Sequence, residues 1–218
     1  MIIYNPNNRE LTVKRMSTAQ VLLDEISAKY CFITGSFLTK EKYNDIDIFV
    51  VTRSKKGIKA GNKKARISKI DFNDLHSLFY HSISKMCISK NMLPTKPLKV
   101  TMSDYWQVIN EAVPTLLNRK DKYHKDIRFL ILYTEYFKSG EILDTLQLDE
   151  KVRSFGNYKD ILRYISENIP TIMNKQRKKS YLRRFLYTQA GLYKDFREYK
   201  AQNFLYNLTH RITRGANG

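Results

Sequence analysis

The residues best suited to chemistry in this sequence are Asp45 and Asp47, which stand two apart at the start of the apolar run 46–52. Side chains two apart in a β-strand project from the same face of a sheet, so we expect the two carboxylates to lie side by side. Two like charges repel, and a divalent cation relieves the repulsion because hard cations take oxygen ligands. The pair therefore predicts a magnesium site.

Two further segments are expected at the same point. Gly35 and Ser36 follow the apolar stretch 30–34, and a glycine there lets backbone N–H groups and the serine hydroxyl approach a phosphate closely. Asp71 lies in a third apolar segment, and three converging carboxylates can hold two magnesium ions. Asp74 is an alternative third ligand, and Asp71 has an alternative place at the N-terminus of the next helix, whose dipole attracts a carboxylate.

The elements that must position these residues follow from the hydrophobic pattern. Apolar residues spaced as one helix face, after the N-cap candidate Ser17, predict a helix over 17–29. Residues 53–69 carry eight positive charges and no acidic residue, which indicates a mobile basic hairpin loop. Short β-branched and aromatic runs predict strands over 30–34, 46–52 and 66–72.

From Asn73 onward the pattern is helical almost throughout, so the expected fold class is α+β. We expect an α/β domain over 1–95 and a basic α-helical domain over 96–218, divided near Pro94 and Pro97. The predicted helices span 73–90, 104–118, 122–138, 157–168, 180–193 and 196–213. The spacing in the 122–138 helix predicts one buried face, made of Phe129, Leu132, Tyr133, Tyr136 and Phe137.

The candidate site residues together resemble the signature of the DNA polymerase beta-like nucleotidyltransferase superfamily. That signature is a Gly-Ser turn (Gly35, Ser36), an apolar-flanked Asp-x-Asp about ten residues on (Asp45, Asp47) and a lone carboxylate on a later strand (Asp71). The resemblance covers roughly residues 17–75. It implies a nucleotidyltransferase-like mixed sheet with helices, followed by an α-helical bundle domain.

The resemblance also implies an enzyme that uses magnesium to transfer a nucleoside monophosphate from NTP to an acceptor, with release of pyrophosphate. Asp45 and Asp47 would bind both metal ions, and Asp71 would ligate the catalytic ion beside the attacking hydroxyl. Gly35 and Ser36 would meet the nucleotide phosphates. Two-domain bacterial members include toxins that act on tRNA, which adds a protein antitoxin to the expected partners.

The charge of the chain favours a polyanionic acceptor. The 39 Lys and Arg residues outnumber the 21 Asp and Glu residues, which gives a formal net charge of +18. Residues 151–218 hold 15 of the basic and 4 of the acidic residues. This is the footprint of phosphate-backbone contact, so we expect RNA such as tRNA as the acceptor. The expected contacts are Lys175, Arg177, Lys178, Lys179, Arg183 and Arg184.

Four points remain open on the sequence. The first alternative is a non-catalytic nucleic-acid-binding or antitoxin-like module on an inactive core. The intact carboxylates argue against this alternative. The second alternative is a different acceptor, either a protein hydroxyl or an aminoglycoside. The positive net charge argues against an aminoglycoside. Arg119 and His124 have a spacing that resembles the motif of HEPN ribonucleases, although the spacing is short and common and a cluster of solvated charges at a helix start explains it better. Lys40 and Lys42 contact the nucleotide phosphates or are merely solvated.

The remaining composition points to a protein of the reducing cytoplasm. Cys31 and Cys87 are far apart and have no Cys or His neighbours at ligand spacing, so neither a disulfide framework nor a zinc site is suggested. The first ten residues lack the pattern of a signal peptide, and the longest apolar run, 129–133, is too short to span a membrane. We therefore expect no membrane partner.

Overall fold

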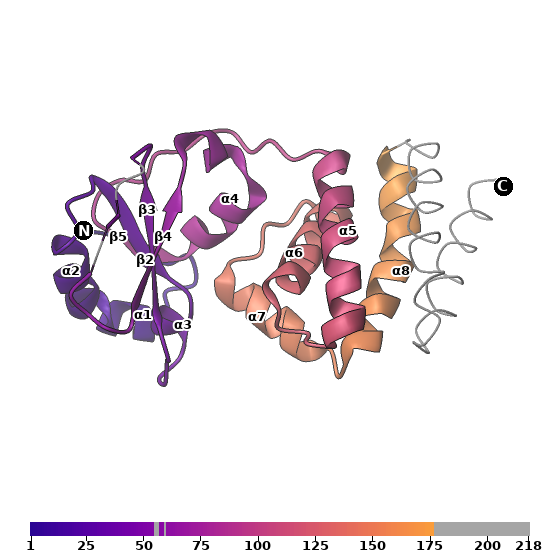
Figure 1. Ribbon diagram of the computed structural model, residues 1–218, viewed down its shortest axis with the longest axis horizontal. Helices are drawn as coiled ribbons and strands as arrows, with labels where there is room; N and C mark the ends of the chain where they lie inside the picture. The colour runs from indigo at the N-terminus through magenta and orange to yellow at the C-terminus, as the bar shows by residue number, and fades with distance from the viewer. Residues whose placement is uncertain (55–56, 59, 177–218) are drawn as a thin grey trace. The chain divides into compact units, whose positions relative to one another are not determined.

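The computed structural model describes residues 1–54, 57–58 and 60–176 of the chain. The helices expected over 180–193 and 196–213 lie outside these residues. The chain divides into two compact units, which Figure 1 traces in sequence colours. The first unit comprises Met1–Val100 and Ile142–Asp149, and the second comprises Thr101–Glu141 and Glu150–Gly218. The first unit thus includes a segment from far along the chain. A single domain boundary near residue 95 does not describe this division.

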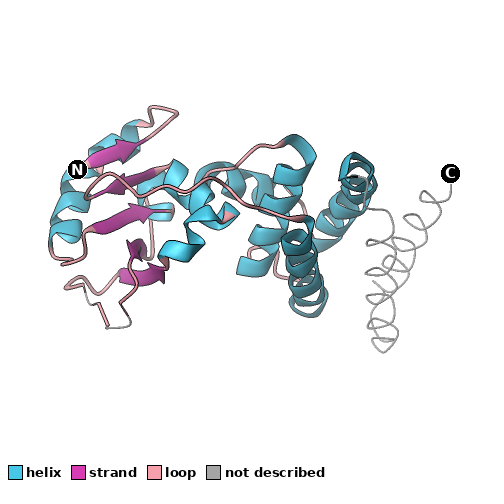
Figure 2. Cartoon of the chain, turned by 90° about the horizontal axis from the view of Figure 1, so that it is seen from above, coloured by secondary structure: helices cyan, strands magenta, loops and turns pink. Residues whose placement is uncertain are grey.

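The first unit contains a five-stranded mixed sheet with the strand order β1-β5-β2-β3-β4. Strands β3 and β4 run parallel, and the other neighbours run antiparallel. Figure 2 shows the strands in magenta, and the expected α+β class is confirmed. The strands are β1 (Ile2–Tyr4), β2 (Tyr30–Thr34), β3 (Ile46–Val51), β4 (Ala65–Ile70) and β5 (Cys87–Ser89).

Helices cover both faces of this sheet, because its central strands are apolar on both sides. Helices α2 (Met16–Asp24) and α3 (Ser36–Thr39) pack on one face against Ile46, Ile48 and Val50. The 3-10 helix η1 (Phe72–His76) and helix α4 (Leu78–Lys85) pack on the other face. Figure 1 shows α2 and α4 on opposite sides of the sheet, and the short helix α1 (Glu10–Lys14) precedes α2.

The expected helix over 73–90 is wrong in its extent. Ser77 is extended and caps α4, with its side chain accepting a hydrogen bond from the backbone N–H of Tyr80 at 3.2 Å. Residues 87–89 leave the helix and form β5 between β1 and β2. A three-residue strand is too short to show a period of its own, so only its pairing reveals it.

The described part of the second unit is helical. Helix α5 begins after a capping box of Thr101 and Asp104, and it continues through Pro114. Helix α7 begins in the residues of the first unit and ends in those of the second. No helix in the described residues is long and apolar enough to cross a membrane. The bounds are α5 (Met102–Arg119), α6 (Lys125–Ser139), α7 (Thr145–Ser154) and α8 (Tyr158–Gln176).

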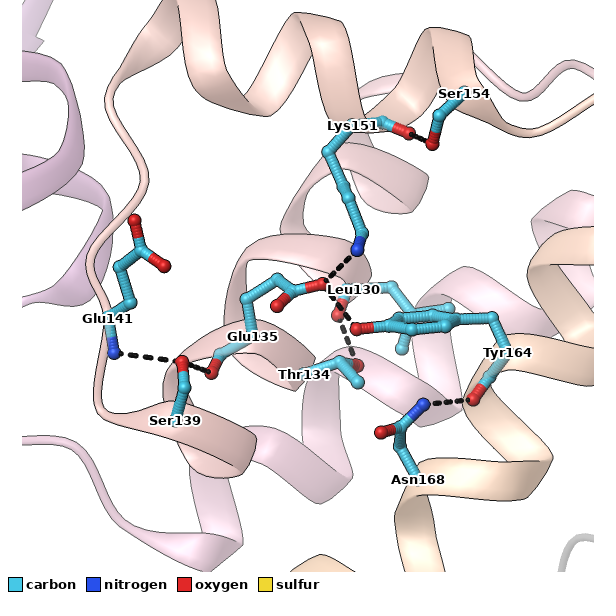
Figure 3. A network of polar contacts seen from close by, with 9 residues as sticks. All are labelled: Leu130, Thr134, Glu135, Ser139, Glu141, Lys151, Ser154, Tyr164 and Asn168. Atoms are coloured by element: carbon cyan, nitrogen blue, oxygen red, sulfur yellow. Dashed lines mark hydrogen bonds and ion pairs between the residues drawn. The ribbon is translucent and has the colours of Figure 1, made fainter.

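A buried carboxylate joins three helices of the second unit. Glu135 of α6 is 8% exposed; it accepts a hydrogen bond from the hydroxyl of Tyr164 on α8 and lies 2.9 Å from Nζ of Lys151 on α7. Figure 3 shows the three side chains converging. The Lys151 ammonium also lies 4.8 Å from the centre of the Tyr164 ring. Glu135 is thus paired and hydrogen-bonded, as a buried charge has to be.

The predicted buried face of α6 is largely wrong. Of that face only Leu132 is fully buried, and the four aromatic residues are partly exposed. The other buried residues of α6 are Ile127, Leu130, Ile131, Thr134 and Glu135. Because α6 is apolar on more than one side and packs against both α5 and α8, periodicity alone does not select its core-facing side.

Candidate active site

The turn after β2 and the start of β3 lie together because the two strands are antiparallel. Thr34, the last residue of β2, pairs with Asp47, near the start of β3. Directly paired residues share a face of the sheet and have Cβ atoms about 5 Å apart. Gly35 and Ser36 follow Thr34 immediately and open helix α3. The structure therefore brings the Gly-Ser turn to the Asp-x-Asp segment, as the sequence analysis expects.

Two features require a glycine at position 35: its backbone conformation and the close approach of Asp47. Its φ of +81° lies in the region that favours glycine, and its carbonyl accepts a hydrogen bond from the N–H of Leu38 at 3.0 Å. A Cβ atom added at Gly35 would lie 3.0 Å from Oδ2 of Asp47. The backbone of the turn thus rests against one carboxylate of the pair, with no room for a side chain between them.

Asp45 and Asp47 lie on the same face of the sheet. Arg66 of β4 pairs in register with Asp47, so these two side chains share a face. The Nη1 atom of Arg66 lies 3.1 Å from Oδ2 of Asp45, which brings Asp45 to that face as well. The side chain of Arg66 is 74% exposed and that of Asp45 is 27% exposed. Solvent and ligands therefore reach this carboxylate.

Asp71 does not join the pair, which corrects the expected third ligand. In the parallel register Arg66 lies beside Asp47, and Asp71 stands five residues further along, about 16 Å at the usual rise of a strand. Its Oδ1 atom instead accepts a hydrogen bond from the N–H of Asn73 at 2.8 Å and caps η1. Asp74 lies within η1, and it does not complete a three-carboxylate metal group with the pair in the described residues either.

The described donors nevertheless fit a magnesium ion. Magnesium in proteins is usually held by one or two carboxylates together with waters and substrate phosphates. Asp45 and Asp47 supply two carboxylates on one face, and the glycine turn packs directly against one of them. In the part of the chain that the structure describes, no three His, Cys, Asp or Glu side chains cluster closely enough to hold a metal by themselves. The pair suits an ion that arrives with its phosphate ligand.

The returning segment Ile142–Asp149 borders the same end of the sheet, and sequence reasoning missed it. The hydroxyl of Thr34 donates to the carbonyl of Met86 at 2.9 Å, so it accepts from the hydroxyl of Thr145, 3.2 Å away. Because Thr34 is the strand partner of Asp47, Thr145 lies one side chain away from the carboxylate pair. No motif in the sequence marks this segment.

Further contacts fasten this segment to the first unit. Ser82 of α4 donates to the carbonyl of Leu143 at 2.6 Å. Lys40, directly after α3, lies with Nζ 2.7 Å from Oδ2 of Asp149. Asp144 is fully buried and caps α7 through Oδ1, which accepts the N–H groups of Leu146 and Gln147. The first turn of α7 is therefore held both by its cap and by the sheet.

Cations also hold the loop that leads to Asp45. The ring of Tyr43 has the guanidinium of Arg15 at 4.8 Å and the ammonium of Lys64 at 5.2 Å from its centre. Arg15 donates to the carbonyl of Glu41 at 3.1 Å. Of the two lysines considered from sequence, Lys40 is paired with Asp149, and Lys42 is exposed. The loop therefore approaches Asp45 in a conformation held by three side chains.

Two other sequence candidates do not belong to the described residues of the first unit. Arg119 and His124 do meet, with Nη1 and Nε2 3.1 Å apart, and Asp126 Oδ2 lies 3.3 Å from Nδ1 of His124. His124 is also the N-cap of α6, so helix capping accounts for its position. The basic set from Arg177 to Arg184 lies outside the described residues, as does the side chain of Lys175.

No protein-family model, no curated protein and no solved structure matches this chain. The chemistry of the site therefore has to be argued from its own residues.

Proposed function

We propose that the chain is a magnesium-dependent nucleotidyltransferase that moves a nucleoside monophosphate from NTP to an acceptor and releases pyrophosphate. The observation that carries this proposal is the contact between Gly35 and Asp47. In this contact, a turn that can bind phosphate lies directly against the Asp47 carboxylate, which can bind a cation. Phosphoryl transfer depends mainly on positioning and on neutralising charge, and these groups supply both.

Each group has a stated role in this reaction. Asp45 and Asp47 hold the cation, and the Ser36 hydroxyl with the backbone of its turn binds phosphate oxygens. Bound magnesium would neutralise negative charge on the phosphates. The acceptor hydroxyl oxygen bonds to the α-phosphorus, the bond from that phosphorus to the pyrophosphate oxygen breaks, and the hydroxyl proton leaves to water.

The proposal needs fewer carboxylates than the sequence suggests. A two-ion arrangement calls for a third carboxylate, and the register keeps Asp71 about 16 Å from the pair. We therefore propose one magnesium ion, shared by Asp45, Asp47 and the phosphates of the nucleotide. Asp71 has no role in this chemistry.

The proposed acceptor is RNA such as tRNA, supported by the net charge of +18. Counterion release gives such a chain affinity for any nucleic acid, so charge supports the class of acceptor without selecting a sequence. A cytoplasmic location and a protein antitoxin partner belong to the same proposal. The competing function is a nucleic-acid-binding module without catalysis. The approach of a glycine turn to an intact carboxylate pair argues for catalysis.

The decisive experiment incubates the protein with each α-labelled NTP, magnesium and total RNA. We expect label in RNA with one or more nucleotides, lost with EDTA and in Asp47→Asn. Label on protein or on an added aminoglycoside would reassign the acceptor but keep the reaction. Salt-dependent RNA binding with no transfer from any NTP to any of these acceptors would favour the non-catalytic module instead.

A further inference from the structure

The strand next to the carboxylate pair presents a cation to it. Arg66 lies in register beside Asp47, and its Nη1 atom lies 3.1 Å from Oδ2 of Asp45. The guanidinium therefore supplies the positive charge that two neighbouring carboxylates require when no metal is bound. Its side chain is 74% exposed, so it can leave Asp45 without disturbing the core.

We propose that Arg66 is an exchangeable counter-ion, which holds Asp45 in the free protein and turns to the phosphates of the substrate when a divalent cation takes its place. This inference rests on the proposed function, because it assigns the cation to Asp45 and Asp47. A guanidinium released at this point keeps five donors in a planar fork, the geometry that binds phosphate oxygens bidentately. Cation binding and phosphate binding are then coupled through one side chain.

A general protective role does not explain this contact. β4 is an edge strand, and charged side chains on edge strands discourage pairing with other chains. Lys63 and Lys64, directly before this strand, are exposed and already place such charge at its start. Protection requires only exposed charge, whereas Arg66 forms an ion pair with a carboxylate of the candidate site.

The first test measures Mn²⁺ binding to the full chain without nucleotide, from the loss of the electron paramagnetic resonance signal of free Mn²⁺. Arg66→Ala should tighten Mn²⁺ binding about two- to fivefold, because exposed ion pairs are weak and their removal frees Asp45 only modestly. The matched control is Arg53→Ala, which removes one exposed positive charge just after β3, where the guanidinium lies over the ring of Phe72. Arg53→Ala should leave Mn²⁺ affinity unchanged.

The second test titrates inorganic tripolyphosphate calorimetrically, with magnesium in excess and again in EDTA. With magnesium, Arg66→Ala should weaken binding about tenfold, the loss of a charge-assisted bidentate contact. In EDTA the variant should lose less affinity than it does with magnesium, because Asp45 then competes with the polyphosphate for the guanidinium. With magnesium, Arg66→Lys should bind tripolyphosphate with an affinity between those of the wild type and Arg66→Ala, because lysine keeps the charge but not the planar fork of donors.

The outcomes separate this inference from the function beneath it. If the wild type binds no Mn²⁺ in the absence of nucleotide, the inference falls, because Arg66 then has no cation to compete with, and the proposed function is judged by the transfer assay. If Asp47→Asn binds Mn²⁺ as tightly as the wild type, both fall. If Asp47→Asn loses Mn²⁺ and Arg66→Ala matches the wild type, Arg66 is no competitor and only the inference falls. Equal losses of tripolyphosphate binding with magnesium and with EDTA would show plain electrostatic attraction and overturn the coupling.

Discussion

Gly35 and Asp47 are in contact across two strands: a Cβ atom at Gly35 would lie 3.0 Å from Oδ2 of Asp47. The glycine turn and the carboxylate therefore form one unit, in which neither changes without moving the other. Five predictions follow from this unit and from the contacts that support the two parts of the chain.

Gly35→Ala should lower stability and abolish transfer. Its φ of +81° strains any other residue, and the new methyl group presses on Asp47, so we expect a loss of about 2–3 kcal/mol in the free energy of unfolding. Gly140→Ala is the matched control, because Gly140 has a φ of +79° but no heavy atom within 4 Å of an added Cβ. The control should cost about 1 kcal/mol and keep transfer. If Gly35→Ala and Gly140→Ala lower the free energy of urea unfolding equally, the contact between Gly35 and Asp47 does not contribute to stability.

Asp47→Asn should reduce transfer at least ~10²-fold, the usual size of a single electrostatic contribution at an active site. The change is nearly isosteric, so thermal unfolding should stay close to that of the wild type. Asp71→Asn should leave transfer within about twofold, because Asn caps a helix as well as Asp does. A large loss in Asp71→Asn would restore the third-ligand assignment and contradict the register.

The Lys40–Asp149 ion pair should contribute little by itself but should respond to salt. Both side chains lie at the surface of the first unit, 35% and 13% exposed. A double-mutant cycle with Lys40→Ala and Asp149→Ala should give a coupling of about 0.5–1 kcal/mol, which 1 M NaCl reduces. A coupling that survives 1 M NaCl undiminished would point to packing and not to charge.

Tyr164→Phe should destabilise the second unit by about 1.5–3 kcal/mol, since it removes a hydrogen bond to the buried carboxylate of Glu135 (Figure 3). Burial, with Glu135 beside it, raises the pKa of Tyr164 above its ordinary value. Tyr136→Phe is the control, because it removes the same hydroxyl group from another partly buried tyrosine of the second unit, on helix α6. Denaturant titration of both variants should separate them by at least 1 kcal/mol.

Stability should decline on the alkaline side. Burial raises the pKa of Cys31 to about 11, and it also raises the pKa values of Cys87, Tyr80 and Tyr105. A raised folded pKa means that the unfolded chain loses its proton first, so the contribution is complete below pH 9 and is lost progressively as pH rises to about 11. Unfolding free energies measured from pH 7 to 11 should be flat and then fall. A constant value up to pH 11 would contradict these directions.

Local pattern was enough to predict much of the first unit. Strand β2 spans the residues expected from its β-branched and aromatic run, and β3 differs from its prediction by one residue. In β3, Ile46, Ile48 and Val50 pack into one core cluster, as the alternation of side chains along a strand dictates. Gly35 followed by Ser36 correctly marked a turn, because only glycine adopts that backbone at no cost. These features depend on neighbours in the sequence.

Register and long-range return were decided only by the tertiary structure. Asp47 lies at the start of β3, and Asp71 follows the end of β4. Because the two strands are parallel, these residues lie at opposite ends of the strand pair, which the local sequence does not indicate. The same pairing puts Arg66 beside Asp47, and the segment 142–149 joins the sheet from far along the chain. The physical reason is that a strand exposes the same hydrogen-bonding groups at every residue, so its offset is fixed by which side chains pack once all elements meet. The carboxylate pair was therefore determined by sequence, and its neighbours by the fold.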